Sequence, residues 1–287
     1  MLFGAQVKQA GGLLAALRRA EAMGAHVMQV FAQSPRQWRH PEGNAERAVA
    51  FSEAWPASRV VRRVVCHAPY LINLGTADGA MYDKSLSCLA ENLRAAAAMG
   101  ASGLVLHLGS HLGAGLDARL DSIAAGLRAV LDEADCPILL ENTAGADATV
   151  GRWFSELARV IDRARGDGRL GVCLDTQHAW AAGMSFETVT AADELVDEID
   201  RTVGLHRLAC LHVNDSKAAK GALLDRHDNV GRGVIGKAPF RALLGHPRLQ
   251  GLPAVLEVPG TDNQGPDARE LRAVRRLHAE GLKLRMA

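Results

Sequence analysis

The stretch Leu170-Gly171-Val172-Cys173-Leu174-Asp175 is a short apolar run that ends in a carboxylate. Its length and aliphatic content are typical of a buried strand in a parallel sheet. Similar runs lie on both sides of it along the chain, and five of them end at, or one residue after, a histidine or a glutamate. The stretch is therefore the clearest copy of a unit that the chain repeats.

Eight strand-like runs of this kind alternate with amphipathic stretches rich in alanine and leucine. The runs are Leu2–Val7, His26–Phe31, Val60–His67, Gly103–His107, Pro137–Glu141, Leu170–Asp175, Leu208–Val213 and Pro253–Val258. Helical spacing of apolar residues is found in Gly12–Met23, Asp83–Met99, Asp117–Asp132, Phe154–Ala164, Ala191–Thr202, Pro239–Leu244 and Ala268–Glu280. This alternation over 287 residues predicts an α/β fold, a (β/α)8 TIM barrel formed by one domain over residues 1–287.

Four longer irregular stretches interrupt the pattern. They are Gln33–Asn44, Gly109–Leu116, Thr176–Phe186 and Asn214–Gly236. Each follows a predicted strand, so in a barrel we expect loops at the carboxyl ends of the strands, where barrel enzymes place their active sites.

The composition limits the class of protein. The formal net charge is only +1, so any nucleic-acid binding must use local clusters of basic residues. The five cysteines form no C-x-x-C pair, which argues against a disulfide framework or a thiolate zinc site and favours packing roles in a reducing cytoplasm. The sequence has no secretion signal and no apolar run long enough to span a membrane, which predicts a soluble cytoplasmic protein without membrane contact.

Potential metal ligands close six consecutive strand runs, from the third to the eighth. They are His67, His107, Glu141, Asp175, His212 and Glu257. A barrel brings the carboxyl ends of its strands to one mouth, where so many clustered charges and imidazoles would be costly to bury without a cation. The mixture of imidazole and carboxylate favours zinc, with manganese or iron as alternatives at some sites.

The loops offer a second group of ligands. His178 follows Asp175 by three residues, and Asp225 and His227 form an Asp-x-His pair. These three side chains could hold one ion with an open coordination position. Nine ligands exceed the needs of one ion, which implies two or three ions and a bridging role for the central Glu141.

Basic and aromatic residues occur in the same loops. One group is Arg36, Trp38, Arg39 and His40, and another is Lys217, Lys220, Arg226, Arg232 and Lys237. Such residues suit contacts to phosphates and bases of a nucleic acid. The segment Gly231–Gly236 matches G-x-G-x-x-G, but no strand immediately precedes it, so we interpret it as a flexible turn rather than a dinucleotide site.

Seven motifs resemble the endonuclease IV type of apurinic/apyrimidinic endonucleases, which are trinuclear zinc enzymes built on a TIM barrel. They cover nearly the whole chain: His67-Ala68-Pro69-Tyr70-Leu71-Ile72-Asn73-Leu74, Leu106-His107-Leu108-Gly109-Ser110-His111, Leu140-Glu141-Asn142-Thr143-Ala144-Gly145, Leu174-Asp175-Thr176-Gln177-His178-Ala179, Leu211-His212-Val213-Asn214-Asp215-Ser216-Lys217, Asp225-Arg226-His227 and Leu256-Glu257-Val258-Pro259. Each of the nine metal ligands of that family has a counterpart here.

The resemblance implies how three Zn²⁺ ions would be shared. One ion would bind His67, His107 and Glu141, with Glu141 bridging to a second ion on Asp175, His212 and Glu257. The third ion would bind His178, Asp225 and His227. Among these ligands Glu141, His178 and Glu257 would be catalytic, while Arg36 and Tyr70 would enter the DNA at the lesion. The loop cations Lys217 and Arg226 are predicted DNA contacts as well.

The resemblance also implies the activity. It is hydrolysis of the phosphodiester 5′ to an abasic site in duplex DNA, with a metal-activated hydroxide as nucleophile, giving a 3′-hydroxyl and a 5′-deoxyribose phosphate. Removal of 3′-blocking groups by the same site and a monomeric protein are further implications.

The chain departs from the family pattern at four places. Gln6 stands where the family has histidine, Leu108 where it has proline, Asp228 where it has a second histidine, and Arg232 where it has the glutamate of Gly-Glu-Gly. None of these positions is a predicted metal ligand.

Two other functions remain open from the sequence. A sugar isomerase or epimerase on a related barrel would need one ion, for which Glu141, Asp175, His212 and Glu257 suffice. A metal-retaining DNA-binding relative without turnover is the second. The surplus ligands have no role in a one-ion isomerase, so the number of bound ions distinguishes it from the nuclease.

Overall fold

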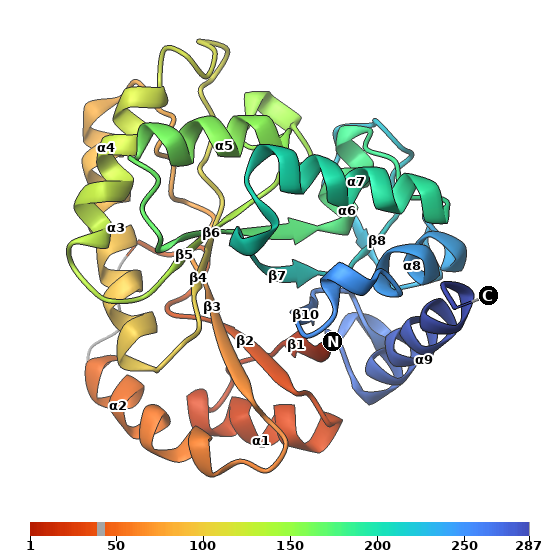
Figure 1. Ribbon diagram of the computed structural model, residues 1–287. Helices are drawn as coiled ribbons and strands as arrows, with labels where there is room; N and C mark the ends of the chain where they lie inside the picture. The colour runs from red at the N-terminus through yellow and green to blue at the C-terminus, as the bar shows by residue number, and fades with distance from the viewer. Residues whose placement is uncertain (39–43, 287) are drawn as a thin grey trace.

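The computed structural model describes residues 1–38 and 44–286. Eight parallel strands close into a barrel in the order β1-β10-β7-β6-β5-β4-β3-β2 (Figure 1). The strands are β1 (Leu2–Gln6), β2 (Val27–Phe31), β3 (Arg63–His67), β4 (Leu104–Leu106), β5 (Ile138–Glu141), β6 (Leu170–Asp175), β7 (Leu208–His212) and β10 (Pro253–Leu256). The predicted (β/α)8 fold is therefore confirmed.

Helices form a ring around the strands (Figure 1). They are α1 (Leu13–Met23), α2 (Asn44–Ala54), α3 (Gly79–Ala98), α4 (Leu120–Leu131), α5 (Phe154–Arg163), α6 (Thr176–Ala182), α7 (Val189–Thr202), α8 (Lys237–Leu244) and α9 (Ala268–Leu284). Short 3-10 turns lie in the connections at Trp55–Ala57, Ala146–Ala148, Leu205–Arg207, Pro247–Leu249 and Thr261–Asn263.

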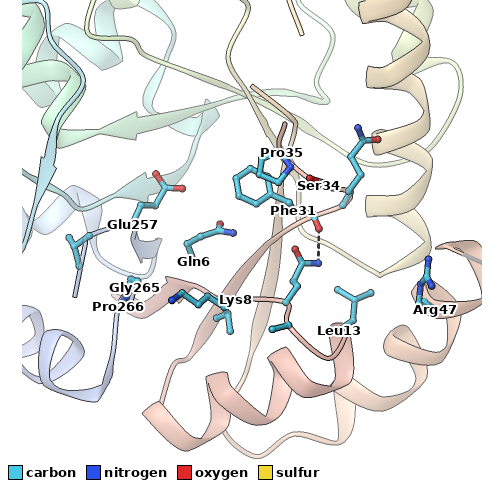
Figure 2. A pocket seen from close by; sticks show the side chains of 17 residues that line it. Gln6, Lys8, Leu13, Phe31, Ser34, Pro35, Arg47, Glu257, Gly265 and Pro266 are labelled. Atoms are coloured by element: carbon cyan, nitrogen blue, oxygen red, sulfur yellow. Dashed lines mark hydrogen bonds between the residues drawn. The ribbon is translucent and has the colours of Figure 1, made fainter. Parts of the chain in front are cut away.

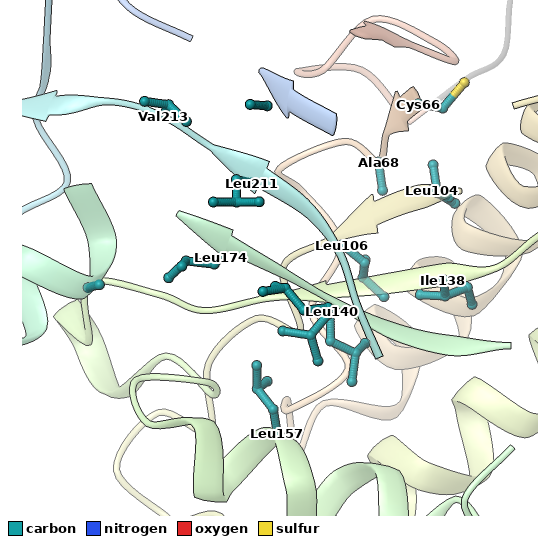
Figure 3. Close-up of a cluster of buried hydrophobic side chains, with 14 of the residues drawn as sticks. Cys66, Ala68, Leu104, Leu106, Ile138, Leu140, Leu157, Leu174, Leu211 and Val213 are labelled. Carbon is teal, nitrogen blue, oxygen red and sulfur yellow. The ribbon is translucent and has the colours of Figure 1, made fainter. Parts of the chain in front are cut away.

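The strands separate two apolar layers because successive side chains point to opposite faces. One set fills the barrel interior: Val27, Val65, Val105, Leu139, Cys173, Cys210 and Val255. The alternate residues pack outward against the helices, and Figure 3 shows several of them, including Cys66, Leu106, Leu140 and Leu174, with Leu157 of α5. Cys66 thus faces outward while its neighbour His67 faces inward.

All five cysteines are buried and free, which agrees with the predicted packing roles. Burial raises the pKa of the Cys66 thiol and, to about 12, that of Cys136. Both thiols therefore stay protonated and behave as small apolar side chains.

Three predicted loops contain regular structure instead. Thr176–Ala182 is a helix, because the Asp175 side chain caps its first turn through the His178 N–H and Gly183 ends it with a left-handed conformation. Asn44 begins α2, a helix that we did not predict, in which Ala48 and Phe51 are buried.

Within Asn214–Gly236, β8 (Asp215–Ser216) and β9 (His227–Asp228) form a two-stranded antiparallel ladder. The ladder closes a long loop and brings His227 back toward β7. None of the described helices is both long and apolar enough to span a membrane.

Candidate metal centre

One layer of polar side chains sits directly above the apolar barrel interior. Each interior residue is followed two positions later by a polar one, so that Val65 precedes His67, Leu139 precedes Glu141 and Cys210 precedes His212. The same two-residue spacing places His107 after Val105, Asp175 after Cys173 and Glu257 after Val255. A two-residue step in a strand returns to the same face, so all six predicted ligands point to the barrel axis at its carboxyl end.

The first group of ligand atoms comes from three adjacent strands. Nε2 of His67 and Nε2 of His107 lie 3.2 and 3.1 Å from the same oxygen, Oε2 of Glu141. Nδ1 of His67 donates to the Ala68 carbonyl at 2.7 Å, which leaves the Nε2 lone pair free toward Glu141. Two imidazole nitrogens and one carboxylate oxygen suit a zinc ion with an open position.

The second group lies around His212. Its Nδ1 is 2.9 Å from Oε1 of Glu141 and 3.2 Å from Oε2 of Glu257, with Oδ2 of Asp175 at 3.9 Å. Ligand atoms of these four residues all lie within 4.8 Å of one another. The two oxygens of Glu141 therefore face two different groups, which is the arrangement that a bridging carboxylate requires.

The third group joins α6 to the β8–β9 loop. Nε2 of His178 lies 3.3 Å from Oδ2 of Asp225, and Nε2 of His227 lies 3.2 Å from Oδ1 of the same residue. Nδ1 of His178 donates to the Asn142 carbonyl at 2.9 Å, so its Nε2 is again the free atom. Oδ2 of Asp175 lies 3.7 Å from His227 and adds a carboxylate between the second and third groups.

Asparagine side chains hold the carboxylates in place. The amide of Asn214 donates to Oδ2 of Asp175 at 2.7 Å, and its oxygen accepts the backbone N–H of Glu257. Asn142 makes two hydrogen bonds to the backbone of Asp175. Both asparagines are buried and follow a proposed ligand by one or two residues, so each ties neighbouring strands together at this mouth.

The electrostatics of this buried centre show that it requires positive charge. Burial opposes ionisation of Glu141, yet the imidazoles of His107, His212 and His178 hold its pKa well below the usual range. Burial lowers the pKa of His212, but the carboxylates of Glu257 and Glu141 outweigh it and hold that pKa well above its ordinary value. The protonated imidazoles of His178 and His212 balance the carboxylates here, and a divalent cation can take that place, so the residues fit a metal cluster.

The segment Gly231–Gly236 surrounds a carboxylate rather than a phosphate. Asp215 is buried and accepts backbone N–H groups from Ser216, Gly231, Ile235 and Gly236 at 2.8 to 3.3 Å. A Cβ at Gly233 would lie 2.4 Å from the Ser216 carbonyl oxygen, so a larger residue does not fit. The segment is thus a turn packed on Asp215, and this packing supports the ladder that carries His227.

Of the predicted DNA contacts, Tyr70 packs against two of the proposed ligands. Its ring centroid is 5.5 Å from that of His67 and 6.3 Å from that of His107, yet 55% of Tyr70 is exposed. Tyr70 lines a cavity of about 310 Å³ together with His107, His178 and Asp225. Its backbone N–H donates to the Pro35 carbonyl, so the segment that carries exposed Arg36 lies beside Tyr70.

The second basic group contains exposed side chains and side chains that lie beside a carboxylate. Lys217 and Arg226 are exposed, and the Lys217 N–H donates to the Arg226 carbonyl across the β8–β9 ladder. Lys220 instead pairs with Glu187, and Arg232 lies 3.4 Å from Glu270. In the first group, Arg39 and His40 lie outside the described residues.

Sequence reasoning missed the contributions of the first two strands to the polar layer. Gln29 follows Val27 by two residues and is fully buried, and Gln6 is its register partner on β1. The signal was a single amide within the apolar run Val27–Phe31. Gln6 also lines a second cavity of about 780 Å³ that reaches Glu257 (Figure 2).

Comparison with known proteins agrees with this geometry. Residues 17–278 match the family model described as xylose isomerase-like TIM barrel. The solved D-tagatose 3-epimerase-like protein shares the fold, with a TM-score of 0.72, 17% identity, and coverage of 99% of this chain and 98% of the other. The fold and the site together define the class of protein: a xylose isomerase-like TIM barrel whose strands carry, at their carboxyl ends, polar side chains that can hold metal ions.

Two relatives narrow the class further. The probable endonuclease 4 of Methanoculleus marisnigri is 38% identical, covering 96% of this chain and 99% of the relative. The crystal structure of endonuclease IV from Thermus thermophilus is similar with a TM-score of 0.80 and 33% identity, covering 98% of this chain and all of that one. The chain therefore belongs to the endonuclease 4 family, which confirms the resemblance found in the sequence.

Proposed function

We propose that the chain is a DNA repair endonuclease that hydrolyses the phosphodiester 5′ to an abasic site in duplex DNA. The products would be a 3′-hydroxyl and a 5′-deoxyribose phosphate, and the same site would remove 3′-blocking groups. The observation that carries this proposal is the convergence of three ligand groups at one barrel mouth in a member of the endonuclease 4 family.

Three Zn²⁺ ions would be held by nine side chains. The first would use His67, His107 and Glu141, the second Glu141, Asp175, His212 and Glu257, and the third His178, Asp225 and His227. When bound, the ions would supply an activated water and positive charge for the phosphoryl oxygens.

The protein side chains would hold the three ions in this arrangement. Glu141 would fix the separation of two ions through its two oxygens, because His67 and His107 lie on one side of it and His212 on the other. Glu257 would complete the second group, and His178 would connect the third group to α6. These three residues are the catalytic positions of the proposal.

The substrate part of the proposal rests on the cavity beside Tyr70. An abasic nucleotide lacks a base, so extruding it from the duplex costs less stacking and pairing energy than extruding an intact one. The cavity of about 310 Å³ lies directly on His107, His178 and Asp225. Tyr70 and Arg36 would fill the gap in the duplex, while Lys217 and Arg226 would contact phosphates.

A one-ion sugar isomerase is the nearest rival because the related barrel of the epimerase-like protein has the same fold. Glu141, Asp175, His212 and Glu257 alone would serve it. The surplus ligands argue for the nuclease: His67 and His107 converge on the far oxygen of Glu141, and His178 and His227 converge on Asp225. A bound-metal count near one per chain would favour the isomerase.

The test is incubation of the zinc-loaded protein with a duplex that carries one tetrahydrofuran abasic analogue. We expect a single cut 5′ to the analogue, no cut in the intact duplex, and loss of cutting after metal removal. Binding of the abasic duplex without any cut would instead support a DNA-binding relative without turnover.

A further inference from the structure

Gln29 connects two proposed metal ligands from a strand that contributes none. Its Nε2 donates to Oε1 of Glu257 at 2.6 Å, and its Oε1 lies 2.9 Å from Nε2 of His212. The side chain is fully buried in β2 and occupies the polar layer two positions above Val27. Each end of one amide is therefore occupied by a different ligand of the second group.

Only one arrangement of protons satisfies both hydrogen bonds of the Gln29 amide. An ionised Glu257 carboxylate can only accept, so the NH₂ of Gln29 must face it. The amide oxygen then faces His212 and can only accept, so Nε2 of His212 must carry a proton. In a neutral imidazole this leaves the lone pair on Nδ1, the atom that lies 2.9 Å from Glu141 and 3.2 Å from Glu257.

The hydrogen bond from Gln29 also determines which oxygen of Glu257 faces the second group. Oε1 is taken by Gln29, while Oε2 lies 3.2 Å from Nδ1 of His212. A single carboxylate oxygen thus remains directed at the second group. Since outer hydrogen bonds of this kind set the orientation and basicity of metal ligands, their loss typically weakens metal binding by about 10- to 100-fold.

We propose that Gln29 is a positioning residue for the ion held by Glu141, Asp175, His212 and Glu257. It sets the proton on His212 and the ligating oxygen of Glu257 together, through one side chain. This inference rests on the metal centre of the proposed function and is independent of DNA cleavage.

The experiment measures zinc retention by Gln29→Met, which keeps the length of the side chain but can make neither hydrogen bond. Wild type and variant are dialysed against increasing concentrations of a chelator, and zinc per chain is counted. We expect one ion to leave the variant at a chelator concentration at least about tenfold lower than in wild type. The other two ions should leave at unchanged concentrations.

Two further variants keep the result interpretable. Gln33→Met removes a buried amide that touches none of the nine proposed ligands, and it should keep the wild-type profile. Gln29→Asn retains the amide but is one methylene too short to span both partners, so it should resemble Gln29→Met and serves if the methionine variant does not fold.

A second measurement observes the proton on Nε2 of His212. In the zinc-loaded protein labelled with ¹⁵N-histidine, the Nε2–H of His212 should exchange slowly with solvent because it donates to Gln29, and Gln29→Met should speed that exchange. An unchanged chelator profile in both Gln29 variants would overturn the positioning role alone. A wild-type protein that retains no zinc would overturn the metal centre itself, and this inference with it.

Discussion

Glu141 and His212 meet at 2.9 Å, between Oε1 of the carboxylate and Nδ1 of the imidazole, while the other carboxylate oxygen faces two more histidines. Glu141 is fully buried at the end of β5, so it has no access to bulk water as an alternative partner. One side chain therefore belongs to two ligand groups, and its loss should affect both.

Glu141→Gln should lower the zinc content by about two ions per chain and incision by at least about 100-fold, because an amide cannot bridge two cations. Glu141 is not a proposed ligand of the third ion, so one ion should remain. The measurements are metal analysis and incision of an abasic duplex. Glu133→Gln is the matched control, since Glu133 is half-exposed and pairs with Arg94. Retention of three ions by Glu141→Gln would refute the bridging role.

Gly233→Ala should weaken the third ligand group through the loop. A Cβ at this position would lie 2.5 Å from Oδ1 of Asp215 as well as against the Ser216 carbonyl oxygen, so the turn must move. We expect incision to fall by about tenfold or more, with a lower thermal midpoint. Gly168→Ala is the control because a Cβ there meets nothing within 4 Å. Equal behaviour of the two alanine variants would disprove the coupling between this turn and His227.

Arg36→Ala should weaken binding to duplex DNA and reduce its dependence on salt. If Arg36 contacts one phosphate, the slope of log affinity against log salt should fall by about one. The control is Arg94→Ala, another exposed arginine, which lies on α3 and pairs with Glu133. Titration of a labelled abasic duplex at several salt concentrations gives both slopes. An unaltered slope for Arg36→Ala would remove this residue from the DNA interface.

Glu270 should make the protein less stable as the pH rises. Its carboxylate is buried, neither oxygen has a hydrogen-bond partner among the described residues, and burial raises its pKa above 4.5 despite nearby Arg232. The folded state therefore holds the proton more tightly than the unfolded state, so stability is lost as pH rises from 4.5 through the raised pKa. Glu270→Gln should remove this loss.

The expected gain for Glu270→Gln is on the order of 1 kcal/mol at neutral pH and close to zero near pH 4.5. Chemical unfolding of both proteins across this pH range, at equal metal loading, gives the difference. A constant difference with pH would show that the Glu270 carboxyl does not titrate differently in the folded state.

The strands and the polar layer could be predicted because both depend on local sequence. Apolar runs such as Leu170–Asp175 identify a buried strand, and one ligand at each carboxyl end follows from the direction of the barrel. Helix α6 was missed because all seven of its residues are buried, so it has no amphipathic period to detect.

Other features depend on contacts between distant segments. Gln29 lies between Met28 and Val30 and resembles a solvent-facing strand residue, until the barrel register shows that it points to the axis beside His212. The wrapping of Gly231–Gly236 around Asp215 likewise joins residues 16 to 21 positions apart, and no local motif encodes it.

The most direct test of the account is incision by metal-stripped protein reloaded with zinc in steps, using a duplex with one tetrahydrofuran abasic analogue. Bound zinc and cutting are measured on the same samples. We predict that cutting 5′ to the analogue appears as the zinc content approaches three ions per chain and is absent without metal. Full cutting by metal-free protein, or no cutting at full loading, would contradict the account.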